Sequence, residues 1–290
     1  MNAIEIKGLE KRYQGFELKL DLALPQGCIL GLVGKNGAGK STTIRSILGM
    51  IRTDAGEISV LGQGSPKENT ALREKIGYVP DEPAFPACMT AAQIGKMMAG
   101  IYRNWDAAEY SRLLHLLEIP DGNTAFQGYS RGMKMKLSIA VALSHHAELL
   151  VLDEPTSGLD PVVRDEVVEL FSEFTREETH SILISSHIVS DLEKLCDYIA
   201  FLDKGRLLLC EETDRLREEY GLIQCTAAQL AEMDRSIIAG HRHTPYGETV
   251  IVKKDLIPAG LDIQPVGIED LFVRQRLLLS MGQTDSQRPD

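Results

Sequence analysis

The chain has 290 residues, of which 43% are hydrophobic and 25% are charged, and its formal net charge is -11. This composition predicts a folded protein with one large domain, or one domain of ordinary size with a small appendage. The acidic charge argues against non-specific binding to nucleic acid and against adsorption to an anionic lipid surface, because both need a basic face.

Three further features favour a cytoplasmic location. No stretch approaches the ~20 apolar residues that cross a bilayer. Residues 1–5 lack the basic and apolar regions of a signal peptide. The cysteines are odd in number and contain no CxxC pair, so the sequence suggests neither a zinc site nor a disulfide framework.

The first part of the chain alternates apolar and polar residues and then becomes continuously apolar. Residues 4–6 and 16–20 alternate as half-buried strands do. Residues 28–33 are apolar throughout, as expected of a strand buried on both faces. A helix is expected to follow from Lys40 to about Met50.

Further along, helical patterns alternate with apolar runs, and this order predicts a mainly parallel α/β sheet. The expected elements are helices over 90–118, 130–144 and 162–175 and buried strands over 149–152 and 181–186.

The pattern changes after Gly221. A hairpin and a short charged helix precede this point, and a small α/β appendage with a strand and a helix follows it. The expected ranges are 198–209 for the hairpin, 213–220 for the helix, and 249–252 and 269–279 for the appendage. We therefore expect a main domain over 1–220, an appendage over 221–280 and a disordered tail over 281–290.

The run Gly34-x4-Gly39-Lys40-Ser41 fits the P-loop pattern in full and lies between a buried strand and a helix. Its glycines let backbone N–H groups wrap phosphates, and the helix dipole adds positive charge. Lys40 is expected to reach the β- and γ-phosphates, and the Ser41 hydroxyl to bind Mg2+. An ordinary glycine turn is the alternative, but a chance match has a frequency on the order of one in a hundred. The residues expected to bind ATP here are Gly34, Asn36, Gly37, Ala38, Gly39, Lys40, Ser41 and Thr42.

A second signal follows the buried strand at 149–152. Asp153 lies where parallel sheets bind ligands and can hold the coordination sphere of Mg2+, as a Walker B aspartate does. Glu154 can then orient or deprotonate the attacking water as a general base. Alone, Asp-Glu-Pro after a strand is more often a turn, but a P-loop about 110 residues upstream favours function.

Three more motifs narrow the class. Ser130-Arg131-Gly132-Met133-Lys134 precedes Asp153, Pro155-Thr156-Ser157-Gly158-Leu159-Asp160 follows Glu154, and His187 follows a buried strand. With these motifs in this order, the sequence resembles ATP-binding subunits of ABC transporters over about 4–216. The resemblance implies an ABC cassette with a RecA-like parallel core, an antiparallel β subdomain and a helical subdomain at about 84–145, followed here by the small α/β appendage.

The resemblance also implies how these residues act. Two subunits would face each other head to tail with two ATP molecules between them. Ser130 and Gly132 would meet the γ-phosphate across the interface, and Asp160 would link the two sites. Glu154, His187 and Lys40 would form the catalytic set, and Tyr13 would stack on adenine. Taken alone, Tyr13 is as readily a half-buried strand residue, and a lone histidine such as His187 is more often structural.

Two positions depart from the family pattern. The usual signature is Leu-Ser-Gly-Gly-Gln, and here Arg131 replaces its first glycine and Met133 its glutamine. This variant resembles ABC-2-type exporters of peptides, antibiotics or lipid-like cargo, including bacitracin-type and phenol-soluble-modulin-type exporters. Arg131 either adds positive charge near the phosphates or faces solvent. Asp81 stands where the family usually has a glutamine that contacts Mg2+, and a carboxylate can still bind that ion.

The expected function is that of an ATP- and Mg2+-dependent motor of an exporter. It would attach to the cytoplasmic face of the membrane through a separate polytopic subunit and pair with a copy of itself or a sibling subunit, without nucleic acid. Residues 84–101 either dock that partner or pack into the helical subdomain. The alternatives are an importer motor, an ABC ATPase acting on ribosomes or DNA, and an inactive regulatory subunit. A single cassette without coiled coil or zinc module argues against the second, and the complete catalytic set argues against the third.

Overall fold

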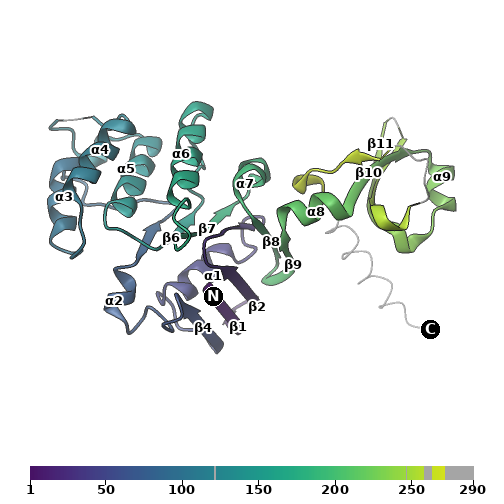
Figure 1. The fold of residues 1–290 in the computed structure, drawn as a ribbon, viewed down its shortest axis with the longest axis horizontal. Helices are drawn as coiled ribbons and strands as arrows, with labels where there is room; N and C mark the ends of the chain where they lie inside the picture. Colours follow the sequence, from purple (N-terminus) through teal and green to yellow (C-terminus); the bar gives the residue numbers. More distant parts are fainter. Residues whose placement is uncertain (121, 246, 258–262, 272–290) are drawn as a thin grey trace. The chain divides into compact units, whose positions relative to one another are not determined.

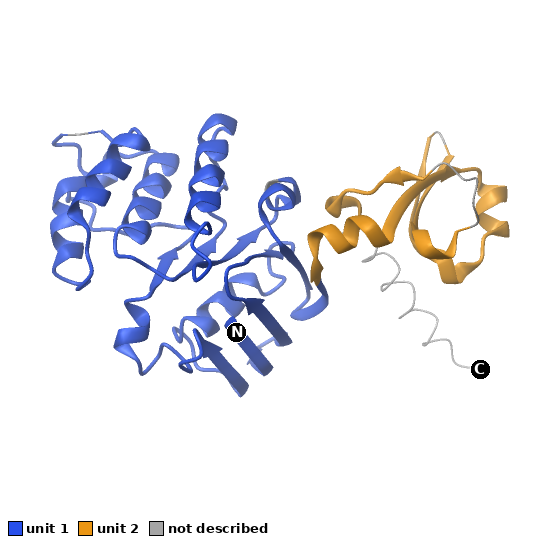
Figure 2. Cartoon of the chain, viewed as in Figure 1, with its two compact units in different colours: residues 1–210 blue, residues 211–290 orange. Residues whose placement is uncertain are grey.

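The computed structural model describes residues 1–120, 122–245, 247–257 and 263–271 (Figure 1). The chain forms two compact units, Met1–Cys210 and Glu211–Asp290 (Figure 2). No helix in the described ranges is long and apolar enough to cross a membrane.

The first unit is built on a nine-stranded sheet in the order β4-β1-β2-β9-β8-β3-β7-β6-β5. Its strands are β1 (Asn2–Tyr13), β2 (Phe16–Pro25), β3 (Ile29–Val33), β4 (Ala55–Val60), β5 (Ile76–Val79), β6 (Leu149–Asp153), β7 (Ser181–Ser186), β8 (Tyr198–Asp203) and β9 (Arg206–Glu212). Its helices are α1 (Lys40–Ile47), α2 (Thr70–Arg73), α3 (Ala91–Ala99), α4 (Ala107–Leu116), α5 (Arg131–Leu143), α6 (Pro161–Phe174) and α7 (Val189–Leu195), with a 3-10 turn η1 (Phe126–Gly128).

The parallel part of this sheet fixes the edge at which ligands bind. β8, β3, β7, β6 and β5 pair in parallel, and every residue of β3, β6 and β7 is buried. The middle of each strand is a continuous apolar run because both faces of these strands are covered. Since they run in one direction, the loops after Val33, Asp153 and Ser186 leave from one edge of the sheet.

Antiparallel strands extend the sheet on its other side. β1 pairs antiparallel with both β2 and β4, and β2 joins the parallel part through Lys19 opposite Arg206. The expected strands at 4–6 and 16–20 lie in β1 and β2, whereas the sequence predicted no element at β4, β5, α2 or α7.

The helical subdomain differs from the sequence prediction at one place. The stretch 90–118, expected to be helical throughout, forms two helices, α3 and α4. Gly100 ends α3, and Asp106 begins α4 by accepting a hydrogen bond from the Glu109 N–H at 2.8 Å. A side chain at Gly95 would place its Cβ 2.5 Å from Cε1 of Tyr110, so α3 and α4 approach closely only because this residue is glycine.

Two other expected helices match closely. α5 begins after the N-cap Ser130 and ends before Ser144. The helix after the P-loop ends at Ile47, three residues before the expected end, because Gly49 adopts a left-handed conformation with φ 66°.

The second unit has a four-stranded antiparallel sheet in the order β11-β12-β10-β13. Its elements are α8 (Thr213–Glu219), β10 (Tyr220–Cys225), α9 (Ala227–Glu232), η2 (Arg235–Ile237), β11 (Ile238–Thr244), β12 (Gly247–Lys253), η3 (Lys254–Leu256) and β13 (Gln264–Pro265). Ile223, Val250 and Val252 form a small core of its own.

The boundary between the units precedes the expected one at 220, because α8 contacts β10 and η3 and so belongs to the second unit. The expected strand at 249–252 lies within β12. Most of the expected helix at 269–279, and the whole tail at 281–290, lie outside the described residues.

Candidate functional site

The loop between β3 and α1 has the backbone that a phosphate cradle needs. Gly37 and Gly39 have φ angles of 79° and 116°, which side chains disfavour. A Cβ at Gly34 would lie 2.6 Å from the carbonyl oxygen of Leu202 in β8, so the loop lies directly on the neighbouring strand. Lys40 folds back over the loop, and its Nζ donates to the Gly34 carbonyl oxygen at 2.6 Å.

A cleft of about 480 Å³ opens at this loop. It is lined by Phe16, Lys35, Asn36, Gly37, Gly39, Lys40, Ser41, Thr42, Asp81 and Glu154. Most of the residues expected to bind the phosphates of ATP therefore surround one space. Gly34 and Ala38 do not line the cleft, but their carbonyl oxygens make contacts that hold the loop. The Gly34 oxygen accepts from Nζ of Lys40, and the Ala38 oxygen accepts from the Gly205 N–H at 2.8 Å.

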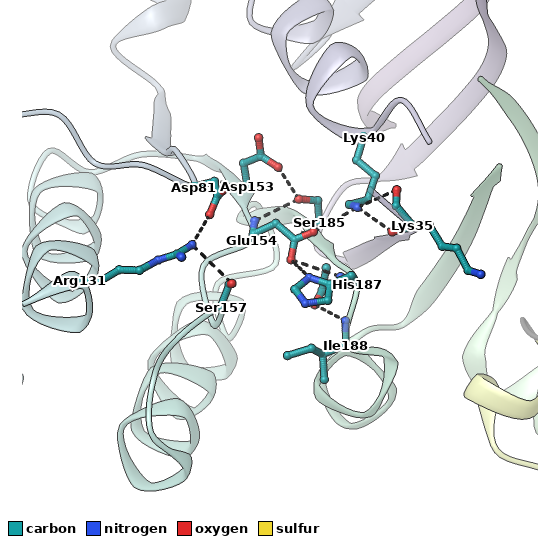
Figure 3. A network of polar contacts seen from close by, with 12 residues as sticks. Lys35, Lys40, Asp81, Arg131, Asp153, Glu154, Ser157, Ser185, His187 and Ile188 are labelled. Atoms are coloured by element: carbon teal, nitrogen blue, oxygen red, sulfur yellow. Dashed lines mark hydrogen bonds and ion pairs between the residues drawn. The ribbon is translucent and has the colours of Figure 1, made fainter. Parts of the chain in front are cut away.

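The carboxylate of Glu154 is held between two nitrogen-bearing side chains (Figure 3). Its Oε1 lies 3.1 Å from Nζ of Lys40, and both side chains are nearly buried, with 11% and 6% exposed. Its Oε2 lies 2.6 Å from Nδ1 of His187 and also accepts the His187 N–H at 3.2 Å. The three predicted catalytic residues therefore form one contiguous group.

The backbone at Glu154 is unusual, because its φ is 53°. A non-glycine residue in this left-handed region costs about 1–2 kcal/mol. The neighbouring strand holds it there: the Glu154 N–H donates to Oγ of Ser185 at 3.1 Å and to the Ser185 carbonyl oxygen at 3.2 Å. This conformation lets Asp153 and Glu154 follow β6 directly while their carboxylates have different partners.

Ser185 contacts both acidic residues, although the sequence analysis predicted no role for it. It lies opposite Asp153 in the register of β6 and β7, and its Oγ donates to Oδ1 of Asp153 at 2.6 Å. One buried hydroxyl thus fixes both acidic residues. The signal in the sequence was a polar Ser-Ser pair ending an otherwise apolar strand, which marks that strand end as facing something polar.

Asp81 and Arg131, the two departures from the family pattern, contact each other. Nη2 of Arg131 lies 2.7 Å from Oδ1 of Asp81 and 3.5 Å from Oγ of Ser157. Arg131 stands in the first turn of α5, and Asp81 lines the cleft from the loop after β5. The sequence left Arg131 either near the phosphates or in solvent; in the structure its side chain is 55% exposed and pairs with the Asp81 carboxylate that lines the cleft.

The residues expected to act across an interface lie at helix N-termini. Ser130 caps α5, its Oγ accepting the Met133 N–H at 3.2 Å. Asp160 caps α6 by accepting the N–H groups of Val162 and Val163. Gly132 lies in the first turn of α5. These positions are compatible with contact to a second subunit's ATP, which stays a prediction.

An aromatic pair stands where β1 turns into β2. The rings of Tyr13 and Phe16 are 6.5 Å apart, and Tyr13 is 48% exposed. Phe16 lines the cleft, although the sequence analysis named only Tyr13. Adenine stacking on Tyr13 stays a prediction, and Phe16 is a second apolar surface available to the base.

The oxygen donors at the cleft suit Mg2+. Ser41 and Asp81 line the cleft, and Asp153 is buried at the end of β6 with its Oδ1 oriented by Ser185. No group of three or more His, Cys, Asp or Glu side chains in the described ranges is arranged to hold a metal ion. Mg2+ does not require one, since it is usually held by one or two carboxylates together with water and substrate phosphates. A bound Mg2+ would neutralise charge on the phosphates.

Comparisons with known proteins agree with this geometry. A family model described as ABC transporter matches residues 18–157. The bacitracin transport ATP-binding protein BcrA of Bacillus licheniformis is 34% identical over 228 residues, which cover 77% of this chain and 73% of BcrA. The chain belongs to the ABC transporter ATP-binding family. YtrB of Bacillus subtilis (strain 168), an ABC transporter ATP-binding protein, is 31% identical over 93% of this chain and 97% of YtrB.

A solved structure of an ATP binding subunit of an ABC transporter extends the match to the fold. Its TM-score is 0.66 at 30% identity, and the match covers 74% of this chain and 92% of that chain. The expected cassette fold is thereby confirmed, as is the resemblance to ATP-binding subunits of antibiotic transport proteins. As a member of this family, the ABC protein is an ATPase.

Ser185→Ala tests whether the hydroxyl between Asp153 and Glu154 serves catalysis. We expect ATPase activity to fall roughly 10- to 100-fold, because the hydroxyl that orients the Asp153 carboxylate and accepts the Glu154 N–H is lost. Ser181→Ala is the matched control, because Ser181 is equally buried in β7. Ser181 lies at the opposite end of this strand from Ser185, and its hydroxyl accepts the Gly27 N–H.

Steady-state ATPase assays and urea unfolding would be measured on both variants. Each variant should lose about 1–3 kcal/mol of unfolding free energy. Equal losses of ATPase activity in both variants would show that Ser185 acts only through stability.

Proposed function

We propose that this ABC ATPase is the motor subunit of an exporter that moves a peptide, antibiotic or lipid-like cargo through a separate membrane subunit. The observation that carries the motor assignment is the carboxylate of Glu154, held between Lys40 and His187 at the wall of the nucleotide cleft. The export assignment draws on the similarity to a bacitracin transport protein and on the signature variant at Arg131 and Met133.

The contacts of Lys40 suggest how ATP prepares the site. Its ammonium group now contacts Glu154 and the Gly34 carbonyl oxygen. Phosphate oxygens carry more charge than either partner and bind ammonium through strong charge-assisted hydrogen bonds. ATP would therefore draw Lys40 away from Glu154 and leave this carboxylate free to accept a proton.

Glu154 then acts as the general base. A water molecule attacks the γ-phosphorus while its proton passes to the carboxylate of Glu154, and ADP leaves with the bond to the γ-phosphoryl group broken. His187 keeps the carboxylate in place, because its Nδ1 and backbone N–H both contact Oε2.

The positions of Ser130, Gly132 and Asp160 favour a head-to-tail dimer as the working form. All three lie in the first turns or at the caps of α5 and α6, and N-terminal N–H groups of helices favour phosphate. ATP binding would close the dimer and hydrolysis would reopen it. The partner in the dimer is a second copy of this chain or a sibling subunit.

Glu154→Gln tests this cycle. The amide keeps the shape of the side chain but cannot take the proton, so we expect hydrolysis to fall by about 100-fold or more while ATP still binds. An ATP-bound dimer should accumulate and be seen by size-exclusion chromatography with light scattering in ATP and Mg2+. Glu173→Gln is the control, because Glu173 is half-exposed on α6 and pairs only at the surface with Arg176. A monomer in saturating ATP would contradict the proposed cycle.

The proposal also places the ABC ATPase at the cytoplasmic face of a membrane, attached through its partner. Purifying the tagged protein from its native membranes in mild detergent, beside an untagged control, should recover a protein with several ~20-residue apolar spans. Recovery of ribosomal proteins or DNA-bound factors instead would favour the alternative of an ABC ATPase acting on those assemblies. A partner complex that takes up external solute would favour an importer.

We further propose that the appendage over 221–280 regulates the dimer. It belongs to a unit with its own sheet and core. A chain ending at Glu212 keeps all nine strands of the large sheet. We expect this truncation to change the ATP concentration for half-maximal dimerisation by about fivefold, the lower range of typical couplings between sites. Unchanged dimerisation and ATPase rate would contradict a regulatory role.

A further inference from the structure

The ion pair between Arg131 and Asp81 joins the helical subdomain to the wall of the nucleotide cleft. Nη2 of Arg131 reaches Oδ1 of Asp81 at 2.7 Å from the first turn of α5 (Figure 3). The same nitrogen lies 3.5 Å from Oγ of Ser157, in the turn between Glu154 and α6. One side chain thus connects α5, the loop after β5 and the turn that follows the general base.

Asp81 has a second use for its carboxylate. It lines the cleft together with Ser41, the P-loop hydroxyl expected to bind Mg2+. Mg2+ binds carboxylate oxygens, and so does a guanidinium group. A Mg2+–nucleotide complex and Arg131 therefore compete for the Asp81 carboxylate. Mg2+ and the guanidinium group repel each other at short range, so one carboxylate holds both less firmly than it holds either alone.

The exposure of the pair suits exchange. The Arg131 and Asp81 side chains are 55% and 46% exposed. An exposed pair contributes little to stability, so exchanging one partner for another costs little. The Lys40–Glu154 pair contrasts with it, because both of its side chains are nearly buried.

We propose that Asp81 is shared in turn by Arg131 and by the Mg2+–nucleotide complex, so that loading the cleft releases Arg131 and with it the first turn of α5. The inference rests on nucleotide binding at the cleft, which the proposed function also requires. Because linkage is reciprocal, whatever holds Arg131 on Asp81 weakens Mg2+–nucleotide binding by the same factor. Arg131 is therefore a positioning residue that couples the cleft to the signature segment.

The test measures binding rather than turnover. ADP affinity would be determined by calorimetry, with Mg2+ and with EDTA, for the full chain and for the variants Arg131→Gln, Asp81→Asn and the double variant. Arg131→Gln should bind Mg2+–ADP about two- to fivefold more tightly, the range expected for loss of a competing exposed ion pair. Metal-free ADP should bind this variant no more tightly than the unaltered protein, because the unpaired Asp81 carboxylate repels the anion. Asp81→Asn should bind Mg2+–ADP more weakly, and Arg131→Gln should have no further effect in that background.

Hydrogen–deuterium exchange supplies the second readout. In the unaltered protein, Mg2+–ADP should speed exchange in the first turn of α5, whereas both single variants should already exchange fast there without nucleotide. Arg112→Gln is the matched control, since it breaks an exposed 2.7 Å pair with Glu109 on α4 and should change neither measurement.

The outcomes separate this inference from the proposed function. Unchanged or weaker Mg2+–ADP binding by Arg131→Gln, or additive effects in the double variant, would overturn the exchange while leaving the ATPase assignment intact. Failure of the unaltered protein to bind ADP at all would instead overturn the proposed function.

Discussion

The parallel register of β3, β7 and β6 is the constraint on which the site depends. It sets Asp153 opposite Ser185 and brings the P-loop, the two carboxylates and the His187 loop to one edge of the sheet. Residues more than a hundred positions apart in the chain become neighbours through strand pairing alone. A shift of one residue between β6 and β7 would turn Ser185 away from Asp153, because successive side chains in a strand point to opposite faces.

Charge balance within the cleft follows from that arrangement. Lys40 and Glu154 form a nearly buried ion pair, and removing both from water is costly unless each finds further partners. Lys40 donates a hydrogen bond to the Gly34 carbonyl oxygen, and the Glu154 carboxylate contacts both Nδ1 and the backbone N–H of His187. The left-handed backbone at Glu154 is part of the same arrangement, since it directs this side chain to Lys40 and His187 while Asp153 contacts Ser185. Polar contacts in the site are thus satisfied within the chain and can be exchanged for those of a nucleotide.

Local patterns made much of this predictable. The glycine spacing before Lys40, the apolar run before Asp153 and the cap at Ser130 each carry their signal within about ten residues, and the family resemblance added the roles of residues such as Glu154 and His187. Two contacts of the site were not predictable from local patterns. Ser185 meets Asp153 only through the register of β7 with β6. Phe16 lies at the cleft only because the turn after β1 places the start of β2 there. The break between α3 and α4 was missed for a different reason, because the cap at Asp106 lies in a stretch whose apolar residues continue on both sides.

The pairing of Asp81 with Arg131 gives the two departures from the family pattern a common physical explanation. An aspartate in place of a glutamine adds a negative charge at the edge of a cleft that must accept a polyanion. An arginine in place of the first signature glycine adds a positive charge near the same place. Together they cancel, at a separation of 2.7 Å between Nη2 and Oδ1. Gly158 fits this arrangement. The Arg131 side chain lies 3.4 Å from where a Cβ of residue 158 would be, and the φ of Gly158 is 76°, which side chains disfavour. Neither substitution is explained as well alone, so the two are best understood as a single electrostatic unit that spans fifty residues of sequence.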